Sequence, residues 1–206
     1  MSIFDRFRND DITVIVSELL IATADSTDPL LDGSIQEVLR ALRDRLKMDV
    51  VFVSELIDGK RVFRFVDTRG HAPELRPGDS NPLEETFCQR IIDGRLPSLI
   101  HNVAVLPVGA VPPLPFRIGA HLSTPIMLTD GSAYGTLCCF SEAPNMALQE
   151  DDLKTLRHCA SLVARKIELA KSRGVKEPPP DWTIEQPAVE YRSSVWALPS
   201  RRSASR

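Results

Sequence analysis

The sequence predicts a mixed α/β domain of the α+β type, in which a central antiparallel sheet lies between two layers of helix and loop. Three observations predict this fold class. Apolar residues recur at helical spacing in four segments, and four further apolar runs have the length of strands. An Asp-Gly pair joins these runs two by two, which is typical of β-hairpins. The order of the elements is helix, helix, strand, strand, helix, strand, loop, strand, strand, helix. We therefore expect the first two helices and the last one on one face of the sheet, and the middle helix and the loop on the other.

Size and composition restrict the kinds of protein that this chain can be. A chain of 206 residues has room for one domain with a full core. Its net charge of −3 provides no basic surface for nucleic acid. No apolar run approaches the length of a membrane span, and the N-terminus lacks the basic-then-apolar order of a signal peptide. We expect a cytoplasmic protein that binds neither nucleic acid nor membranes.

Two helices are expected before the first strand. Residues 12–20 have apolar side chains at helical spacing after the acidic pair Asp10 and Asp11, which favour a helix start. In residues 34–48, Ser34 and Glu37 have the spacing of a capping box. We therefore expect the second helix to begin at Ser34.

The two hairpins supply most of the sheet. The turns are predicted at Asp58–Gly59 and Asp130–Gly131. The flanking strands are predicted at residues 49–56, 61–68, 120–128 and 133–141. The first of these strands is apolar at both alternating positions, so we expect it to be a central strand that is covered on both faces.

A third helix is predicted over residues 81–94. Asn81 can cap it, Pro82 suits its first position, and Glu84 completes a box with the cap. Gly94 suits its end, where a left-handed backbone is favoured. Cys88 falls on or beside the apolar stripe of this helix.

A short strand (residues 96–103) and a proline-rich loop (residues 104–119) follow the third helix. The loop contains four prolines, which disfavour regular helix and sheet. Its remaining residues are too apolar for a loop in water, so we expect a lid that packs over another part of the domain.

The last helix is predicted over residues 148–173, with an acidic start and a basic end that suit the helix dipole. Its apolar residues form a seam that faces either the core or a partner helix. We expect the proline-rich tail, residues 171–206, to be disordered. Three aromatic residues of the tail could contact a protein partner: Trp182, Tyr191 and Trp196.

The adjacent cysteines Cys138 and Cys139 raise the question of thiol chemistry. On a strand, neighbouring side chains point to opposite faces, so this pair cannot easily form a disulfide or share a metal ion. Free cysteine is among the most buried residue types, and we expect both to be packing residues.

Four segments of the chain resemble a GAF domain of the kind found as sensory inputs beside bacterial kinases and cyclic-dinucleotide enzymes. These segments are "DVVFVSEL", "NPLEETFCQRIIDGRLPSLI", "IGAHLSTPIML" and "DGSAYGTLCCFS". The resemblance implies a GAF-like domain over residues 30–170, after an N-terminal helix in residues 1–29 and before the tail. It implies a six-stranded antiparallel sheet, terminal helices that often mediate dimers, and a small-molecule pocket under the middle helix and lid.

A further resemblance, to the chromophore-binding domains of phytochromes, suggests which side chains would line this pocket. The implied ligand-binding residues are Phe52, Ser54, Phe87, Cys88, Leu122, Thr124, Ile126, Thr136, Cys138 and Phe140.

The resemblance leaves several kinds of ligand chemistry to weigh. Cyclic-nucleotide-binding relatives carry an Asn-Lys pair after the last hairpin, but Asn145 has no following lysine here. Bilin-holding motifs are absent, and no two of the four histidines have the i, i+4 spacing of a helical metal site. We therefore expect an unknown small-molecule ligand, and no metal, cyclic nucleotide or bilin.

Three functions remain open at this point. We expect a sensory or regulatory module that binds a small molecule in bacterial signal transduction. We expect this module not to be an enzyme, and to form a homodimer through its first and last helices. One alternative is a thiol enzyme of the free methionine sulfoxide reductase type. That family's cysteines lie around the lid, where this chain has none, although Cys88 and Cys138 could approach each other. The other alternative is a structural dimerisation module with a collapsed pocket.

Overall fold

The computed structural model describes residues 30–70 and 75–172. The helix expected in residues 12–20 and the aromatic residues of the C-terminal tail lie outside the described residues. Within those ranges, no helix is both long enough and apolar enough to cross a bilayer.

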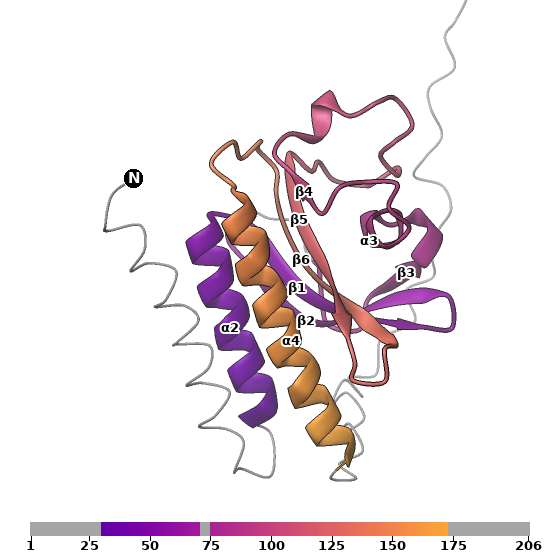
Figure 1. Ribbon diagram of the computed structural model, residues 1–206. Coiled ribbons are helices and arrows are strands. Elements are labelled where there is room, and N and C mark those ends of the chain that lie inside the picture. Colours follow the sequence, from indigo (N-terminus) through magenta and orange to yellow (C-terminus); the bar gives the residue numbers. More distant parts are fainter. Residues whose placement is uncertain (1–29, 71–74, 173–206) are drawn as a thin grey trace, which may run out of the picture. The chain divides into compact units, whose positions relative to one another are not determined.

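The described chain forms a six-stranded antiparallel sheet, as predicted (Figure 1). Its strand order is β3-β2-β1-β6-β5-β4. The strands are β1 (Val50–Ile57), β2 (Lys60–Thr68), β3 (Ser80–Pro82), β4 (Leu99–Ile100), β5 (Ala120–Met127) and β6 (Ala133–Ser141). β1 lies between β2 and β6, and its residues 50–54 are buried, which confirms the prediction of a central strand.

Both predicted hairpins are present. In the first, Asp58 and Gly59 have φ values of 49° and 71°, the left-handed pair that a two-residue hairpin turn requires. From this turn, the pairing of β1 with β2 places Arg61 opposite Leu56 and Phe63 opposite Ser54, so Arg61 and Phe63 lie on the same face of the sheet as Ser54. A bulge between Val53 and Ser54 then shifts the pairing, so that Val53 lies opposite Phe65.

Helices α2 (Leu30–Leu46) and α4 (Glu150–Ser172) cover one face of the sheet (Figure 1). Helix α2 begins four residues before the predicted start, so position 34 falls inside the helix and not at its N-cap. On α4, Leu153, Leu156 and Val163 from the apolar seam are buried in the core of this chain. The seam therefore packs inside the domain, and a partner helix would have to use another side of α4.

The other face carries helix α3 (Phe87–Ile92), the short helical turns η1 (Leu83–Glu85) and η2 (Val103–Val105), and the proline-rich loop. Helix α3 is shorter than predicted, because Asn81 and Pro82 belong to β3 instead of a cap. β3 is an edge strand, where proline is tolerated. Thr86 caps α3 by accepting a hydrogen bond from the backbone N–H of Gln89. Gly94 follows the helix with a φ of 71°, as predicted.

The proline-rich loop packs on α3, as expected for a lid. Leu106, Val111 and Leu114 contact a buried cluster that includes Phe87 and Ile91 of α3. The Arg90 guanidinium donates a hydrogen bond of 2.8 Å to the backbone carbonyl of Gly109 and another to that of Ala110. Loop and helix therefore form one layer over this face of the sheet.

Candidate functional site

The two faces of the sheet differ in how their buried polar side chains are arranged. The face toward α2 and α4 is a largely apolar core, with Asp67 at its edge paired to Arg43 of α2. The face toward α3 gathers seven buried polar and thiol residues, which we call the polar cluster: Ser54, Arg61, Cys88, His121, Ser123, Thr136 and Cys138. Buried polar groups cost free energy unless they are paired, so this contrast marks the α3-side face as the candidate site.

Two thiols meet at the centre of the polar cluster. Cys88 comes from α3 and Cys138 from β6, and their Sγ atoms lie 3.4 Å apart. The Cys88 sulfur also accepts hydrogen bonds from Thr136 Oγ1 at 3.2 Å and from Arg61 Nη1 at 3.4 Å. Three donors around one sulfur favour its thiolate form.

Hydroxyl groups complete the network on the sheet side. Ser54 and Thr136 share a hydrogen bond of 2.8 Å across β1 and β6. Because Thr136 donates to Cys88, its oxygen is free to accept from Ser54. Ser123 lies on the neighbouring strand β5, and its Oγ atom is 3.0 Å from the Cys138 sulfur.

Arg61 is a buried cation at the edge of the cluster, with a side chain held between two rings and an amide. Its Cζ atom lies 4.6 Å from the ring centre of Phe63 and 5.4 Å from that of Phe52. Its Nε donates to Asn81 Oδ1 at 3.1 Å. None of the described carboxylate side chains forms an ion pair with Arg61. The Cys88 sulfur, 3.4 Å from Arg61 Nη1, is therefore the group on which the positive charge of Arg61 acts most directly.

The two thiols respond oppositely to this setting. The hydrogen bond from Cys138, and then the positive charge of Arg61 and the hydrogen bond from Thr136, hold the pKa of Cys88 well below its usual range. Burial, together with the neighbouring Cys88, raises the pKa of Cys138. The setting thus favours the thiolate form at Cys88 and the thiol form at Cys138.

His121 is the least satisfied member of the polar cluster. Its side chain is 2% exposed and stacks on Phe87 of α3, with ring centres 4.9 Å apart. Its Nδ1 atom has no hydrogen-bond partner among the described residues. Burial, and secondly the charge of Arg61, lower the pKa of His121 to about 3, so the ring is neutral at physiological pH.

Aromatic rings fill the space beside the polar cluster. Phe116 of the proline-rich loop stacks on Phe140 of β6 at 5.5 Å, and Phe52 meets Phe140 edge-on at 6.5 Å. The loop residue Ile118 packs against the same group. In this conformation the lid therefore inserts its own side chains where the sequence predicts a ligand.

Seven of the ten predicted site residues come together on the α3-side face. They are Phe52, Ser54, Phe87, Cys88, Thr136, Cys138 and Phe140. The face predicted for β5 is wrong. Leu122 and Ile126 belong to the core against α2 and α4, and Thr124, paired with Leu137, shares that face. The residues of β5 that face α3 are His121 and Ser123.

The prediction for the adjacent cysteines is confirmed in its geometry. Cys138 lies on the α3-side face and Cys139 in the core against the helices. Burial raises the pKa of the Cys139 thiol. Cys139 is thus a packing residue, whereas Cys138 belongs to a hydrogen-bonded network.

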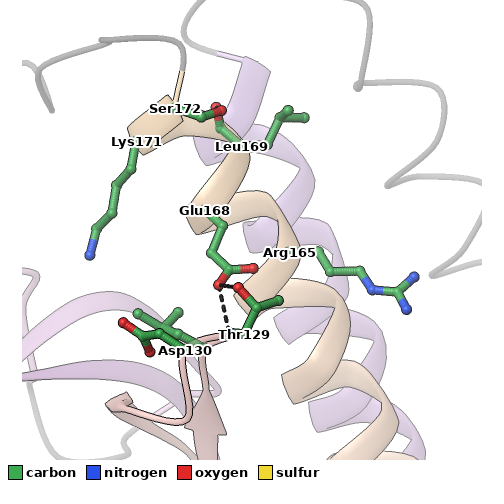
Figure 2. A pocket seen from close by; sticks show the side chains of 8 residues that line it. Thr129, Asp130, Arg165, Glu168, Leu169, Lys171 and Ser172 are labelled. Carbon is green, nitrogen blue, oxygen red and sulfur yellow. Dashed lines mark hydrogen bonds between the residues drawn. The ribbon is translucent and has the colours of Figure 1, made fainter.

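A shallow surface hollow of about 510 Å³ lies elsewhere, between the β5–β6 turn and the end of α4 (Figure 2). Two of its lining residues, Thr129 and Glu168, are hydrogen-bonded to each other. Glu168 accepts hydrogen bonds of 2.6 Å from both the backbone N–H and the hydroxyl of Thr129. This hollow is a junction between the hairpin and α4. In the described ranges, no three His, Cys, Asp or Glu side chains gather closely enough to hold a metal ion.

Comparisons with known proteins support the fold. Residues 31–167 match the family model of the GAF domain. No curated protein sequence matches this chain. Among solved structures, the chain is similar to the GAF domain of an Acinetobacter phosphoenolpyruvate-protein phosphotransferase, with 17% identity and a TM-score of 0.62 over 86% of this chain and 99% of that one.

Two further structures show the range of proteins with this fold. One is the free methionine-R-sulfoxide reductase of Neisseria meningitidis, with 14% identity and a TM-score of 0.62 over 81% of this chain and 93% of that one. The other is part of a methyl-accepting chemotaxis protein, with 17% identity and a TM-score of 0.59 over 80% of this chain and 99% of that one. At these identities the likeness concerns the fold, and the family follows from the match over residues 31–167. The chain belongs to the GAF domain family.

Proposed function

We propose that this chain is a sensory module of bacterial signal transduction that binds a small molecule on its α3-side face. The observation that carries the proposal is His121, a buried side chain whose Nδ1 has no hydrogen-bond partner among the described residues. A core with only a structural role gains nothing from such a group, whereas a ligand with a hydrogen-bonding group would satisfy it. The similar structure from a methyl-accepting chemotaxis protein supports the sensory class.

Binding would require the lid to move. Phe116 and Ile118 pack on the sheet beside the polar cluster, so a ligand has to displace them. A ligand that binds only the displaced arrangement would shift the population toward it, and this shift is the signal that we propose. The aromatic surroundings and Arg61 favour a flat molecule with a polar or anionic group.

Native mass spectrometry of the full chain, purified from its own host, tests this function. We expect a noncovalent adduct in the wild-type protein and its loss in His121→Phe, which keeps the stack on Phe87 but lacks the ring nitrogens. His158→Phe is the matched control, because His158 is exposed on α4. An adduct of equal abundance in both variants, or none in the wild type, would contradict a site at His121.

We also propose that the module turns over no substrate. The contact of 3.4 Å between Cys88 and Cys138 is the observation that favours a thiol enzyme of the methionine sulfoxide reductase type. Both side chains are 0% exposed, however, so a sulfoxide cannot reach either sulfur in this conformation. With free methionine-R-sulfoxide and a dithiol reductant, we expect no turnover above that of Cys88→Ser. Turnover that Cys88→Ser abolishes would establish the enzyme instead.

The homodimer through the first and last helices stays a prediction. The charges on α4 suit antiparallel pairing with a second copy, because its first turn is acidic and Lys171 lies in its last turn. Light scattering on a chain truncated after Arg173 measures this state. A stable monomer would exclude a dimer through the helices.

A further inference from the structure

We propose that Cys88 and Cys138 form an oxidisable dithiol site, which hydrogen peroxide converts to an intramolecular disulfide. This inference rests on the proposed sensory function and deepens it, because it names a chemical signal that the same face of the sheet receives. Its basis is the meeting of two thiols from elements that lie 50 residues apart in the sequence.

The geometry is close to that of a disulfide. The Sγ atoms lie 3.4 Å apart, so bond formation at about 2.05 Å requires an approach of little more than 1 Å. Cys138 lies on β6, which is held on both sides by β1 and β5. Cys88 lies on α3, a helix of six residues. The movement therefore falls on α3, which would be drawn toward the sheet.

The surroundings assign different roles to the two sulfurs. Cys88 accepts hydrogen bonds from Arg61 and Thr136, and Arg61 has no described carboxylate to pair with. A cation and hydrogen-bond donors favour the thiolate, which is the nucleophilic form of cysteine. Cys88 is therefore the attacking sulfur and Cys138 the resolving one.

The reaction has two steps. The Cys88 thiolate attacks one oxygen of hydrogen peroxide, the O–O bond breaks, and Cys88 becomes a sulfenic acid. The other oxygen leaves as hydroxide and takes up the proton that Cys88 had released, giving water. The Cys138 sulfur then loses its proton and attacks the Cys88 sulfur, which breaks the S–O bond and forms the S–S bond. The sulfenic oxygen leaves as water together with that proton. Two thiols and one hydrogen peroxide thus give one disulfide and two water molecules.

Burial decides which oxidants can react. Both thiols are 0% exposed, so the oxidant must enter during a local opening of the layer above the sheet. Hydrogen peroxide is only slightly larger than water and needs a small opening. Bulky disulfides need a far larger one, so the site selects the small oxidant.

Oxidation also changes the charge balance of the site. A disulfide is neutral, so Arg61 loses the anion beside it while its side chain stays 7% exposed. A buried cation without a partner is costly, and the guanidinium must find another anion or move. The disulfide thereby alters the surface on which a ligand would bind.

The test uses the full chain treated with hydrogen peroxide, followed by alkylation of free thiols under denaturing conditions and peptide mapping by mass spectrometry. We expect a cross-linked peptide pair that joins Cys88 to Cys138, lighter by two hydrogen atoms than the two reduced peptides. Cys88→Ser and Cys138→Ser should each lose this pair. In Cys138→Ser, dimedone should label Cys88, because the sulfenic acid then has no resolving thiol.

The matched control is the double variant Cys139→Ala, Cys159→Ala, which should keep the cross-link. Alanine suits these two positions because they lie in the apolar core against the helices. Circular dichroism should show that every variant is folded before oxidation. Four unreacted thiols, a cross-link between Cys139 and Cys159, or Cys88 oxidised to the sulfinic acid with Cys138 free would each overturn the proposal.

The result of the cross-linking experiment can be distinguished from that of the ligand-binding experiment under the proposed function. The native mass measurement is made on reduced protein and reports ligand binding alone. An adduct without the cross-link removes only the dithiol site, and the cross-link without an adduct removes only small-molecule binding.

Discussion

At the scale of single residues, His121 shows how one strand position can set the character of a site. Its ring is buried, stacked on Phe87 and unpaired at Nδ1. Desolvation and the nearby Arg61 both oppose its protonation. The folded protein therefore keeps this imidazole neutral well below the pH at which an exposed histidine becomes charged.

This difference predicts a pH dependence of stability. The pKa of His121 falls from 6.5 to about 3 on folding, so between these values the unfolded chain binds a proton that the folded chain does not. The free energy of unfolding should therefore decrease as the pH falls through this window. From pH 6.5 to pH 5 the loss attributable to His121 should be about 1.6 kcal/mol. Urea titrations at a series of pH values give the free energy of unfolding of wild type and of His121→Phe, and the two plots of this free energy against pH should differ in slope. Parallel plots would show that folding leaves the pKa of His121 unchanged.

At the scale of elements, the sequence predicts what is encoded locally. The Asp-Gly turns and alternating apolar runs located both hairpins, and those assignments are confirmed. The third helix was located, but its start was misplaced. Both Asn81 and Thr86 are plausible caps, and the sequence does not show that Asn81 pairs with Arg61 in a sheet edge.

The site was predicted less completely, for two physical reasons. On β5 residues 120–124 are all buried, so the alternation of polar and apolar residues does not distinguish its two faces. Leu122, Thr124 and Ile126 were therefore assigned to the wrong face. The second reason is Arg61, which lies opposite Leu56 near the hairpin turn and is buried on the α3-side face. An arginine is seldom buried, so the sequence has no signal that this side chain enters the site.

Gly135 offers a sharp test of the packing between β1 and β6. A Cβ atom at this position would lie 1.7 Å from the backbone oxygen of Ser54. Gly135→Ala should therefore destabilise the domain by roughly 3 kcal/mol or more, although alanine normally stabilises a strand relative to glycine. Thermal unfolding measures the effect, and Ala133→Ser, at an exposed position of the same strand, is the control. Equal stability of the two variants would mean that the strands lie farther apart than described.

At the scale of the whole domain, the sheet separates α3 from the long helices α2 and α4 (Figure 1). The polar cluster lies on the α3 side of this sheet. Cys138 faces α3, and its neighbour Cys139 faces the core formed with α2 and α4. β6 is therefore the element through which a change at the polar cluster would reach the core against α2 and α4.

Hydrogen exchange can follow that transmission. In the oxidised protein, the Cys88–Cys138 disulfide would hold α3 to the sheet, so exchange in Phe87–Ile92 should slow by about tenfold, because opening the helix no longer separates it from β6. Exchange in the part of α4 that packs on β5 and β6 should also slow, by about threefold, because openings of β6 become rarer. The Cys88→Ser protein, treated in the same way, controls for unspecific oxidation. If the change is confined to α3, the sheet isolates the dithiol from the helices, and the signal must leave the domain through α3 or the proline-rich loop instead.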